Sequence, residues 1–194
     1  MKNIDLAHVH RNQDGTWAEP HYLLDHLAGT ANLAEEFARP FASEAWAKAC
    51  GYGHDTGKGA AKWQLYLASK SGYFDESAHL ETSPGKLDHS APSSKLVEEV
   101  FGKGIGRILS YCIAGHHAGL PNWLGDQGAL AYRLQNADST AIPEQYSQLL
   151  NSLNPMRPPR KFDSKGLDLS LWIRMLFSCL VDADCIHNNF EELY

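Results

Sequence analysis

The sequence predicts an all-α protein, a compact helical bundle around one apolar core. Apolar residues recur at steps of three and four positions along most of the chain, whereas the strict alternation that is typical of strands is scarce. The chain has 194 residues, of which 43% are apolar, and this is enough for a domain with a substantial core. We therefore expect a single domain over 1–194, without internal repeats or low-complexity tracts.

The N-terminal half predicts three helices and a loop. The first helix covers about 23–37 and the second about 43–52, where two glycines end the periodic pattern. A turn over 54–58 precedes the third helix, whose side chains at helical spacing predict core packing. These side chains are Trp63, Tyr66 and Leu67. A polar stretch rich in Gly and Ser, 71–85, is expected to be a surface loop.

The C-terminal half predicts three further helices. One covers about 88–101, with Pro92 confined to its first turn. The next, about 105–116, presents one apolar face at helical spacing: Ile105, Ile108, Leu109, Cys112, Ile113 and His116. A proline-rich basic connector over 154–161 leads to the last helix, about 169–186. That helix is apolar on most sides, so we expect it to be central.

Composition excludes several classes of protein. The four cysteines, Cys50, Cys112, Cys179 and Cys185, form no Cys-x-x-Cys pair, so neither a disulfide framework nor a zinc–thiolate site is expected, and buried free thiols are. No apolar run reaches the roughly 20 residues that span a bilayer, and the first residues lack the apolar stretch of a signal peptide, which predicts a soluble cytoplasmic protein. Net charge is −6, whereas domains that hold nucleic acid by charge alone are usually basic.

Histidine is the unusual component of this sequence, because several of the ten histidines fall in apolar segments. His26 lies within the first predicted helix, and His54 and Asp55 form an adjacent pair beside glycines. Three more histidines lie at helix ends, His89 at a start and His116 and His117 together at a finish. On the last helix Asp182 continues an inward stripe formed by Met175, Cys179 and Ile186. A carboxylate on a central helix requires a cation, because charged groups are rarely buried unless they are paired or bind a metal.

Together these residues predict a metal centre, although each histidine alone would more often be a hydrogen-bonded core residue. Neutral imidazole and carboxylate are the natural ligands of borderline transition metals. The adjacent His54 and Asp55 can serve one metal and bridge to a second, because a carboxylate has two oxygens. Two metals about 3.5–4 Å apart stabilise the attacking and leaving oxygens of a phosphoryl displacement. The prediction is a phosphodiesterase that needs no protein nucleophile.

The motifs also resemble a known family. His26, the His54-Asp55 pair and Asp182 match the H…HD…D signature of the HD phosphohydrolase superfamily. The wider pattern runs from about Leu23 to Glu192 and consists of His54-Asp55-Thr56-Gly57-Lys58, Trp63-Gln64-Leu65-Tyr66-Leu67, Asp88-His89-Ser90, His116-His117-Ala118-Gly119-Leu120-Pro121 and Arg174 to Asp184. In this order it resembles the HD nuclease domain of the CRISPR-associated helicase-nuclease of type I systems.

The resemblance implies an HD-domain bundle with a metal site between the central helices and a nuclease that cleaves single-stranded DNA in CRISPR interference. Its implied partners are a guide-RNA surveillance complex that displaces the strand and a helicase domain or subunit that delivers it. One metal would be held by His26, His54, Asp55 and Asp182, and the other by Asp55, His89, His116 and His117. Lys58 would hold the scissile phosphate or offset its charge in the transition state.

Two other functions stay open from the sequence. One is an HD-type phosphohydrolase that acts on nucleotides or cyclic dinucleotides, although the Gly-Tyr-Pro element of the cyclic-dinucleotide branch is replaced by Gly119-Leu120-Pro121. The other is a catalytically silent, metal-stabilised module that recruits partners. The histidine-rich ligand set favours one or two ions of Mn, Fe, Co, Ni or Zn, with Mg less natural.

The remaining histidines and charges have simpler interpretations. His8 and His10 are expected at the surface or in a local structural role, with a place at the cleft entrance as the alternative. His21, His79 and His187 are expected to be ordinary surface histidines. Asp184 lies about 200° around the helix from Asp182, so a cap or a salt bridge is its expected role. Arg157, Arg160, Lys161 and Lys165 form the one basic cluster and are expected to lie in a solvated linker, with contact to a DNA backbone or a partner as the alternative.

Overall fold

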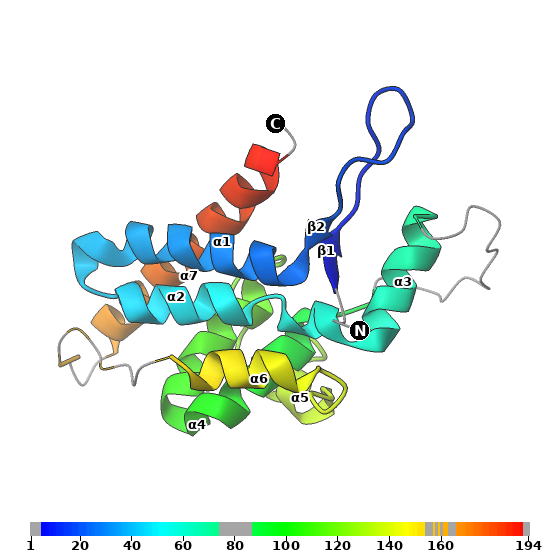
Figure 1. The fold of residues 1–194 in the computed structure, drawn as a ribbon. Coiled ribbons are helices and arrows are strands. Elements are labelled where there is room, and N and C mark those ends of the chain that lie inside the picture. Colours follow the sequence, from blue (N-terminus) through cyan, green and yellow to red (C-terminus); the bar gives the residue numbers. More distant parts are fainter. Residues whose placement is uncertain are drawn as a thin grey trace.

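The computed structural model describes residues 5–73, 87–153, 157, 159, 161–162 and 166–191. Most of these residues are helical, which confirms the predicted all-α class (Figure 1). Within these ranges no helix combines the length and the apolar character needed to cross a membrane. Most of the predicted loop over 71–85 lies outside the described residues, as do His79, Arg160 and Lys165.

Three helices form one side of the bundle. Helix α1 (Leu23–Ala38) lies along α2 (Glu44–Gly53), after the short 3-10 turn η1 (Arg39–Phe41), and both pack against the long helix α7 (Leu167–Glu191) (Figure 1). The first two helices approach closely at Gly51, where an added Cβ would overlap the backbone of Ala31. This close approach places the middle of α1 beside the end of α2, where His54 follows.

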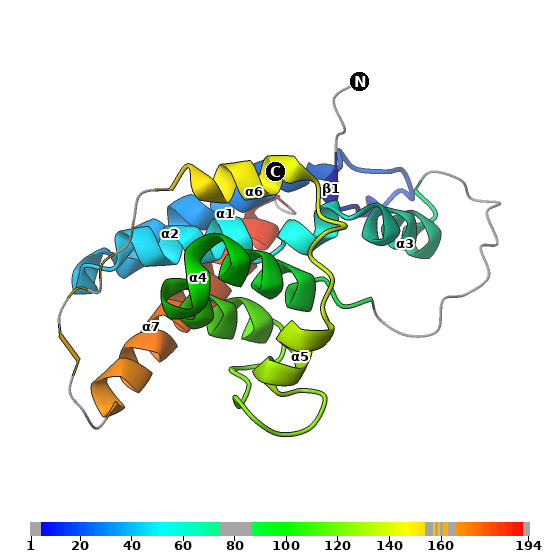
Figure 2. The same ribbon diagram turned by 90° about the horizontal axis from the view of Figure 1, so that it is seen from below.

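Helix α4 (Ser90–Gly115) is a helical hairpin rather than one rod. At Gly102 the backbone has φ 76° and ψ 171°, so two helical arms meet there at a sharp turn (Figure 2). The arms lie side by side, because Ser110 Oγ lies 2.8 Å from the carbonyl oxygen of Ser94 and Arg107 pairs with Glu98. The two separate helices predicted for 88–101 and 105–116 correspond to these arms. The turn brings the start and the end of α4 to the same place.

The shorter elements surround this framework. A 3-10 turn, η2 (Thr56–Gly59), and helix α3 (Ala61–Ser71) follow α2. Helices α5 (Leu130–Asn136) and α6 (Glu144–Asn151) lie against α4 in a region where we predicted no element. A small antiparallel ribbon pairs β1 (Leu6–His8) with β2 (His21–Tyr22), and its loop extends away from the bundle (Figure 1). This ribbon is also absent from the sequence prediction.

The core lies between α1, α2, α4, α6 and α7. Trp46 and Trp172 meet in an edge-to-face contact with centroids 4.8 Å apart, and the indole of Trp172 donates to Ser43 Oγ at 2.8 Å. Their neighbours in the core include Leu23, Leu27, Cys50, Val97, Leu109, Ile113, Tyr146, Leu150, Leu176 and Leu180. The thiols of Cys50, Cys112 and Cys179 are free and buried as predicted, whereas Cys185 is exposed, which contradicts the prediction for that residue.

Candidate metal centre

The Asp55 carboxylate lies at the centre of a buried group of histidines. His54 caps the end of α2 and Asp55 caps the start of η2, so the connection between these two elements places both side chains. Asp55 is 1% exposed and His54 is completely buried. Such burial of a carboxylate is costly unless cations or hydrogen-bond donors surround it.

One oxygen of Asp55 faces a first set of ligands. Asp55 Oδ2 lies 3.3 Å from His26 Nε2 and 3.5 Å from His54 Nε2. The Asp184 carboxylate completes this set, with Oδ1 3.4 Å from each of the same two nitrogens. We call His26, His54, Asp55 and Asp184 the α1–α7 set, because α1 supplies His26 and α7 supplies Asp184.

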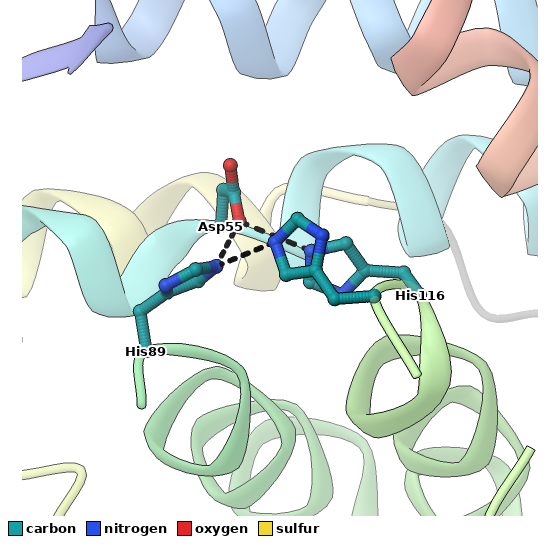
Figure 3. Close-up of side chains that lie close together, drawn as sticks. Asp55, His89 and His116 are labelled. Carbon is teal, nitrogen blue, oxygen red and sulfur yellow. Dashed lines mark hydrogen bonds and ion pairs between the residues drawn. The ribbon is translucent and has the colours of Figure 1, made fainter. Parts of the chain in front are cut away.

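The other oxygen of Asp55 faces a second set, supplied by both ends of α4. Asp55 Oδ1 lies 3.0 Å from His89 Nε2 and 3.4 Å from His116 Nε2 (Figure 3). His117, which is more exposed, brings its Nε2 to 3.1 Å from that of His89. Asp55, His89, His116 and His117 have ligand atoms that all lie within 4.8 Å of one another. We call these four residues the α4 set.

Backbone carbonyls orient two of the imidazoles. His54 Nδ1 lies 2.7 Å from the carbonyl oxygen of Gly51, and His116 Nδ1 lies 2.7 Å from that of Ile113. A carbonyl oxygen only accepts, so each Nδ1 carries a proton, and in the neutral ring the Nε2 lone pair points into the site. This is the arrangement in which second-shell hydrogen bonds hold metal-ligating histidines.

Unsatisfied polar atoms show that these residues fit a metal ion. Asp55 Oδ1 and His116 Nε2 are buried, yet neither makes a hydrogen bond of good geometry with any residue that the structure describes. When His116 is neutral, its lone pair faces the lone pairs of the carboxylate across 3.4 Å. A cation between them removes this repulsion, and imidazole with carboxylate is the donor chemistry of borderline transition metals. The buried clusters of His and Asp can therefore hold a metal ion.

The glycines after Asp55 allow η2 to approach α4. An added Cβ at Gly57 would overlap the carbonyl oxygen of His89. The amide of Gly57 instead donates to Ser93 Oγ at 2.8 Å, and that hydroxyl donates to the same His89 carbonyl at 2.9 Å. This short chain of hydrogen bonds fixes Asp55 relative to His89.

Lys58 is buried against Asp55 rather than extended toward solvent. Its ammonium donates to Asp55 Oδ2 at 2.7 Å and lies 3.0 Å from His8 Nε2, and the side chain is 4% exposed. The ring of Trp63 lies below it, with the ammonium 5.3 Å from the ring centroid. Gln64 ties this region to β1, because its amide donates to the carbonyls of Lys58 and Leu6. These contacts make Lys58 a partner of Asp55.

The pKa values follow from burial and from these neighbours. Burial raises the pKa of Asp55, but the Lys58 ammonium and His54 outweigh burial and hold this pKa well below its usual range. Burial lowers the pKa of His26 and of His117 to about 4, so both rings are neutral and able to bind metal near pH 7. Burial also opposes the charged form of His54, but the Asp55 and Asp184 carboxylates raise the pKa of His54.

The predicted ligand Asp182 is wrong, and Asp184 takes its place. Asp182 is exposed on α7, whereas Asp184 is 8% exposed and reaches His26 and His54. The buried face of α7 follows Trp172, Leu176, Leu180 and Asp184, each four residues apart. Of the stripe on which the prediction relied, Met175 and Asp182 are exposed, whereas Cys179 is buried. Since α7 is apolar on most sides, its periodicity alone could not decide between the two faces.

His21 and His187, which were predicted at the surface, lie beside the site instead, and so does His8, for which a place at the cleft entrance was the alternative prediction. His8 contacts Lys58, and His21 and His187 have their rings within 5.6 Å of the ring of His26. Burial lowers the pKa of His8 and of His21 to about 3. The spacing of His187 three residues after Asp184, which places both on one helical face, is the sequence signal that could have indicated its position. No comparable signal exists for His8, because its place depends on the pairing of β1 with β2.

Trp63 is buried, as predicted, and it also contacts the site. Its ring makes an edge-to-face contact with His89, with centroids 5.9 Å apart, and covers Lys58. Trp63 is buried but is not among the residues of the main core. It therefore forms a wall of the site.

A pocket of about 790 Å³ opens beside the α4 set. His89 and His117 lie in its wall together with Leu120, Pro121 and Asp126. Arg133 also lines the pocket, but it donates to the Asp88 carboxylate at 3.0 Å and to the carbonyl of Ala114 at 2.6 Å. A ligand in this pocket would lie against the exposed side of the α4 set.

Comparison with known proteins yields no family: no family model matches the chain, and no curated protein matches it either. The resemblance to HD nucleases therefore stays a prediction that depends on the motifs and on the site geometry described above.

Proposed function

We propose that this protein is a metal-dependent phosphodiesterase that cleaves single-stranded DNA. The observation that carries the proposal is the position of Asp55 between the two ligand sets. Its Oδ2 faces His26 and His54, and its Oδ1 faces His89 and His116. A carboxylate whose two oxygens serve two groups of imidazoles is the arrangement that a bridging ligand of two ions requires.

The proposal gives each of the two ligand sets a role. The α1–α7 set would hold one divalent ion and the α4 set the other, with Asp55 shared. When bound, such ions supply positive charge to the attacking and leaving oxygens and lower the pKa of water toward neutrality. Transition metals of the Mn to Zn series suit these ligands better than Mg does.

The chain itself contributes orientation and charge. The carbonyls of Gly51 and Ile113 hold His54 and His116 with Nε2 toward the centre, and the Ser93 hydroxyl fixes the separation of Asp55 from His89. Lys58 keeps Asp55 ionised and positioned. Because its ammonium is occupied by Asp55 and His8, this role is better supported than direct contact with the scissile phosphate.

The charge of the chain bears on how DNA would be bound. Net charge is −6, and Arg133, which lines the pocket beside the site, is paired with Asp88. Recognition of the DNA backbone by a basic surface is therefore weak, so bound ions and a partner would provide most of the attraction. A helicase domain or subunit, acting with a guide-RNA surveillance complex, would supply single strands, as the motif resemblance implies.

The test is cleavage of circular single-stranded DNA by the chelator-treated protein after addition of Mn, Fe, Co, Ni, Zn or Mg. We expect cleavage with at least one transition metal, and a loss of at least about 100-fold in Asp55→Ala. Asp182→Asn is the matched control, since it changes an exposed carboxylate of the same helix as Asp184. Absence of cleavage with every metal, or equal cleavage by Asp55→Ala, would exclude the proposal.

The pocket beside His89 and His117 favours one alternative, a phosphohydrolase that acts on nucleotides or cyclic dinucleotides. A volume of about 790 Å³ lies in the range of small-molecule sites. Competition separates the two substrates. A nucleotide that is hydrolysed with a higher kcat/KM than the DNA, and that inhibits DNA cleavage at low concentration, would establish the alternative.

A further inference from the structure

We propose that His21, His26 and His187 form a further site for a divalent transition-metal ion. Three separate segments supply these residues: β2, α1 and the C-terminal part of α7. Their ligand atoms all lie within 4.8 Å of one another. The site lies beside the α1–α7 set and shares His26 with it, but its other two members belong to neither ligand set of the candidate centre.

The three rings are packed against one another. The rings of His21 and His26 meet edge to face with centroids 5.1 Å apart, and those of His21 and His187 do so at 5.1 Å. His187 lies over His26 with an interplanar angle of 29° and a centroid distance of 5.6 Å. Ligand atoms within 4.8 Å of one another are close enough for three imidazoles to share one ion, as in metal sites with three histidines and an open position.

Gly29 provides the space for His187. It lies one turn after His26 on α1, and an added Cβ there would overlap the imidazole of His187. His187 Nε2 lies 3.4 Å from the carbonyl oxygen of Asp25. Because a carbonyl only accepts, the proton is on Nε2 and the lone pair is on Nδ1. A backbone carbonyl therefore orients His187 through Nε2, whereas His54 and His116 are oriented through Nδ1.

His26 has a nitrogen to spare for this site. Its Nε2 faces His54, Asp55 and Asp184, whereas its Nδ1 is buried and has no hydrogen-bond partner among the described side chains and backbone. A neutral imidazole has a single lone pair. If both sites were filled, His26 would have to serve both ions, which would require its ring proton to pass to solvent.

The chemistry of the ligands selects the ion. Three imidazoles suit Zn, Cu, Ni or Co and do not suit Mg or Ca, which prefer oxygen ligands. A bound ion would join β2 to α1 and α7, and so would hold the ribbon that carries His8 against Lys58. The inference does not depend on catalysis, since a structural ion would have the same ligands.

The experiment counts bound metal in the full-length, untagged chain. Chelator-treated protein is dialysed against Zn or Co, and equivalents are measured by elemental analysis. We expect the double variant His21→Gln/His187→Gln to bind one equivalent fewer than the unaltered chain. His10→Gln, which removes a histidine of the ribbon loop that belongs to neither the candidate centre nor this site, should bind the full number. In the Asp55→Ala background the double variant should again lose one equivalent, which separates this site from the candidate centre.

Gly29→Ala tests the same site without removing a ligand. Its Cβ displaces the His187 ring, so it should lose the same single equivalent while circular dichroism shows an unchanged helical content. If the double variant does not fold, His187→Gln alone and Gly29→Ala decide the matter. Equal metal content in the unaltered chain, the His187→Gln variant and Gly29→Ala would overturn the proposal, whether or not the protein cleaves DNA.

Discussion

Replacing Asp184 by Asn should reduce metal affinity strongly, whereas the same change at Asp182 should not. Asp184 Oδ1 lies 3.4 Å from both His26 Nε2 and His54 Nε2, and Asp182 is exposed on another face of α7. Asn keeps the shape of the side chain and removes one negative charge. The pair of variants therefore isolates the charge at one position of the helix.

The magnitude follows from Coulomb's law. The 3.4 Å from Asp184 Oδ1 to His26 Nε2 sets the scale of the site, and two unit charges at that separation interact by about 5 kcal/mol at an effective dielectric constant of about 20. Part of this energy is lost to screening, because the Asp184 side chain is 12% exposed. We expect Asp184→Asn to lose about 3 kcal/mol of metal-binding free energy, which corresponds to an affinity about 100-fold weaker.

The assay is titration of the chelator-treated protein with Zn or Co, followed by calorimetry or by the visible absorption of Co. Thermal unfolding in excess chelator serves as the control that both variants fold. If Asp182→Asn weakened metal binding as much as Asp184→Asn, or if neither variant changed it, the assignment of Asp184 to the site would be refuted.

Three more predictions concern the framework and its protonation. Gly102→Ala should destabilise the protein by about 1–3 kcal/mol, because φ 76° with ψ 171° is a conformation that essentially only glycine adopts. Gly104→Ala should not destabilise it, because Gly104 has open space and no positive φ. Urea unfolding compares the two variants, and equal stabilities would contradict the hairpin turn. Gly57→Ala should weaken metal binding at least about 10-fold, because its Cβ pushes η2 away from the carbonyl of His89; unchanged titration curves would disprove this. The metal-free protein should lose stability on acidification, because burial lowers the pKa of His26 from 6.5 to about 4. The pKa of His26 is lower in the folded protein than in the unfolded chain. The stability that His26 contributes is therefore fully present above pH 6.5 and is lost between pH 6.5 and about 4, by up to about 3 kcal/mol. Melting temperatures in chelator across this range measure the effect, and a flat profile in which His26→Gln behaves like the unaltered chain would contradict it.

Much of the site could be predicted from short-range pattern. His54 and Asp55 lie next to each other after a helix that glycines end, so they are brought together without any knowledge of the fold. His89 was predicted at the start of one helix and His116 at the end of the next, and in the structure they cap the two ends of α4. What the pattern did not show is that Gly102 turns the two arms back on each other, which places both ends at Asp55.

The rest of the site depends on long-range contact. His8 reaches Lys58 only because β1 pairs with β2 and Gln64 bonds to Leu6. Neither strand has enough residues to show an alternating pattern. The sequence also does not distinguish a histidine that is exposed from one that lies beside a buried carboxylate.

The sequence by itself determined the all-α class, the positions of the longer helices and the concentration of imidazole and carboxylate groups near helix ends. Helical periodicity and chain-breaking glycines are local properties, so they can be read without the fold. Only the tertiary structure decided that Asp184 rather than Asp182 joins His26, because α7 is apolar on most sides and its neighbours select the buried face. It also decided that the two oxygens of Asp55 serve two separate groups of histidines, since that depends on how α1, α4 and α7 pack around a single carboxylate.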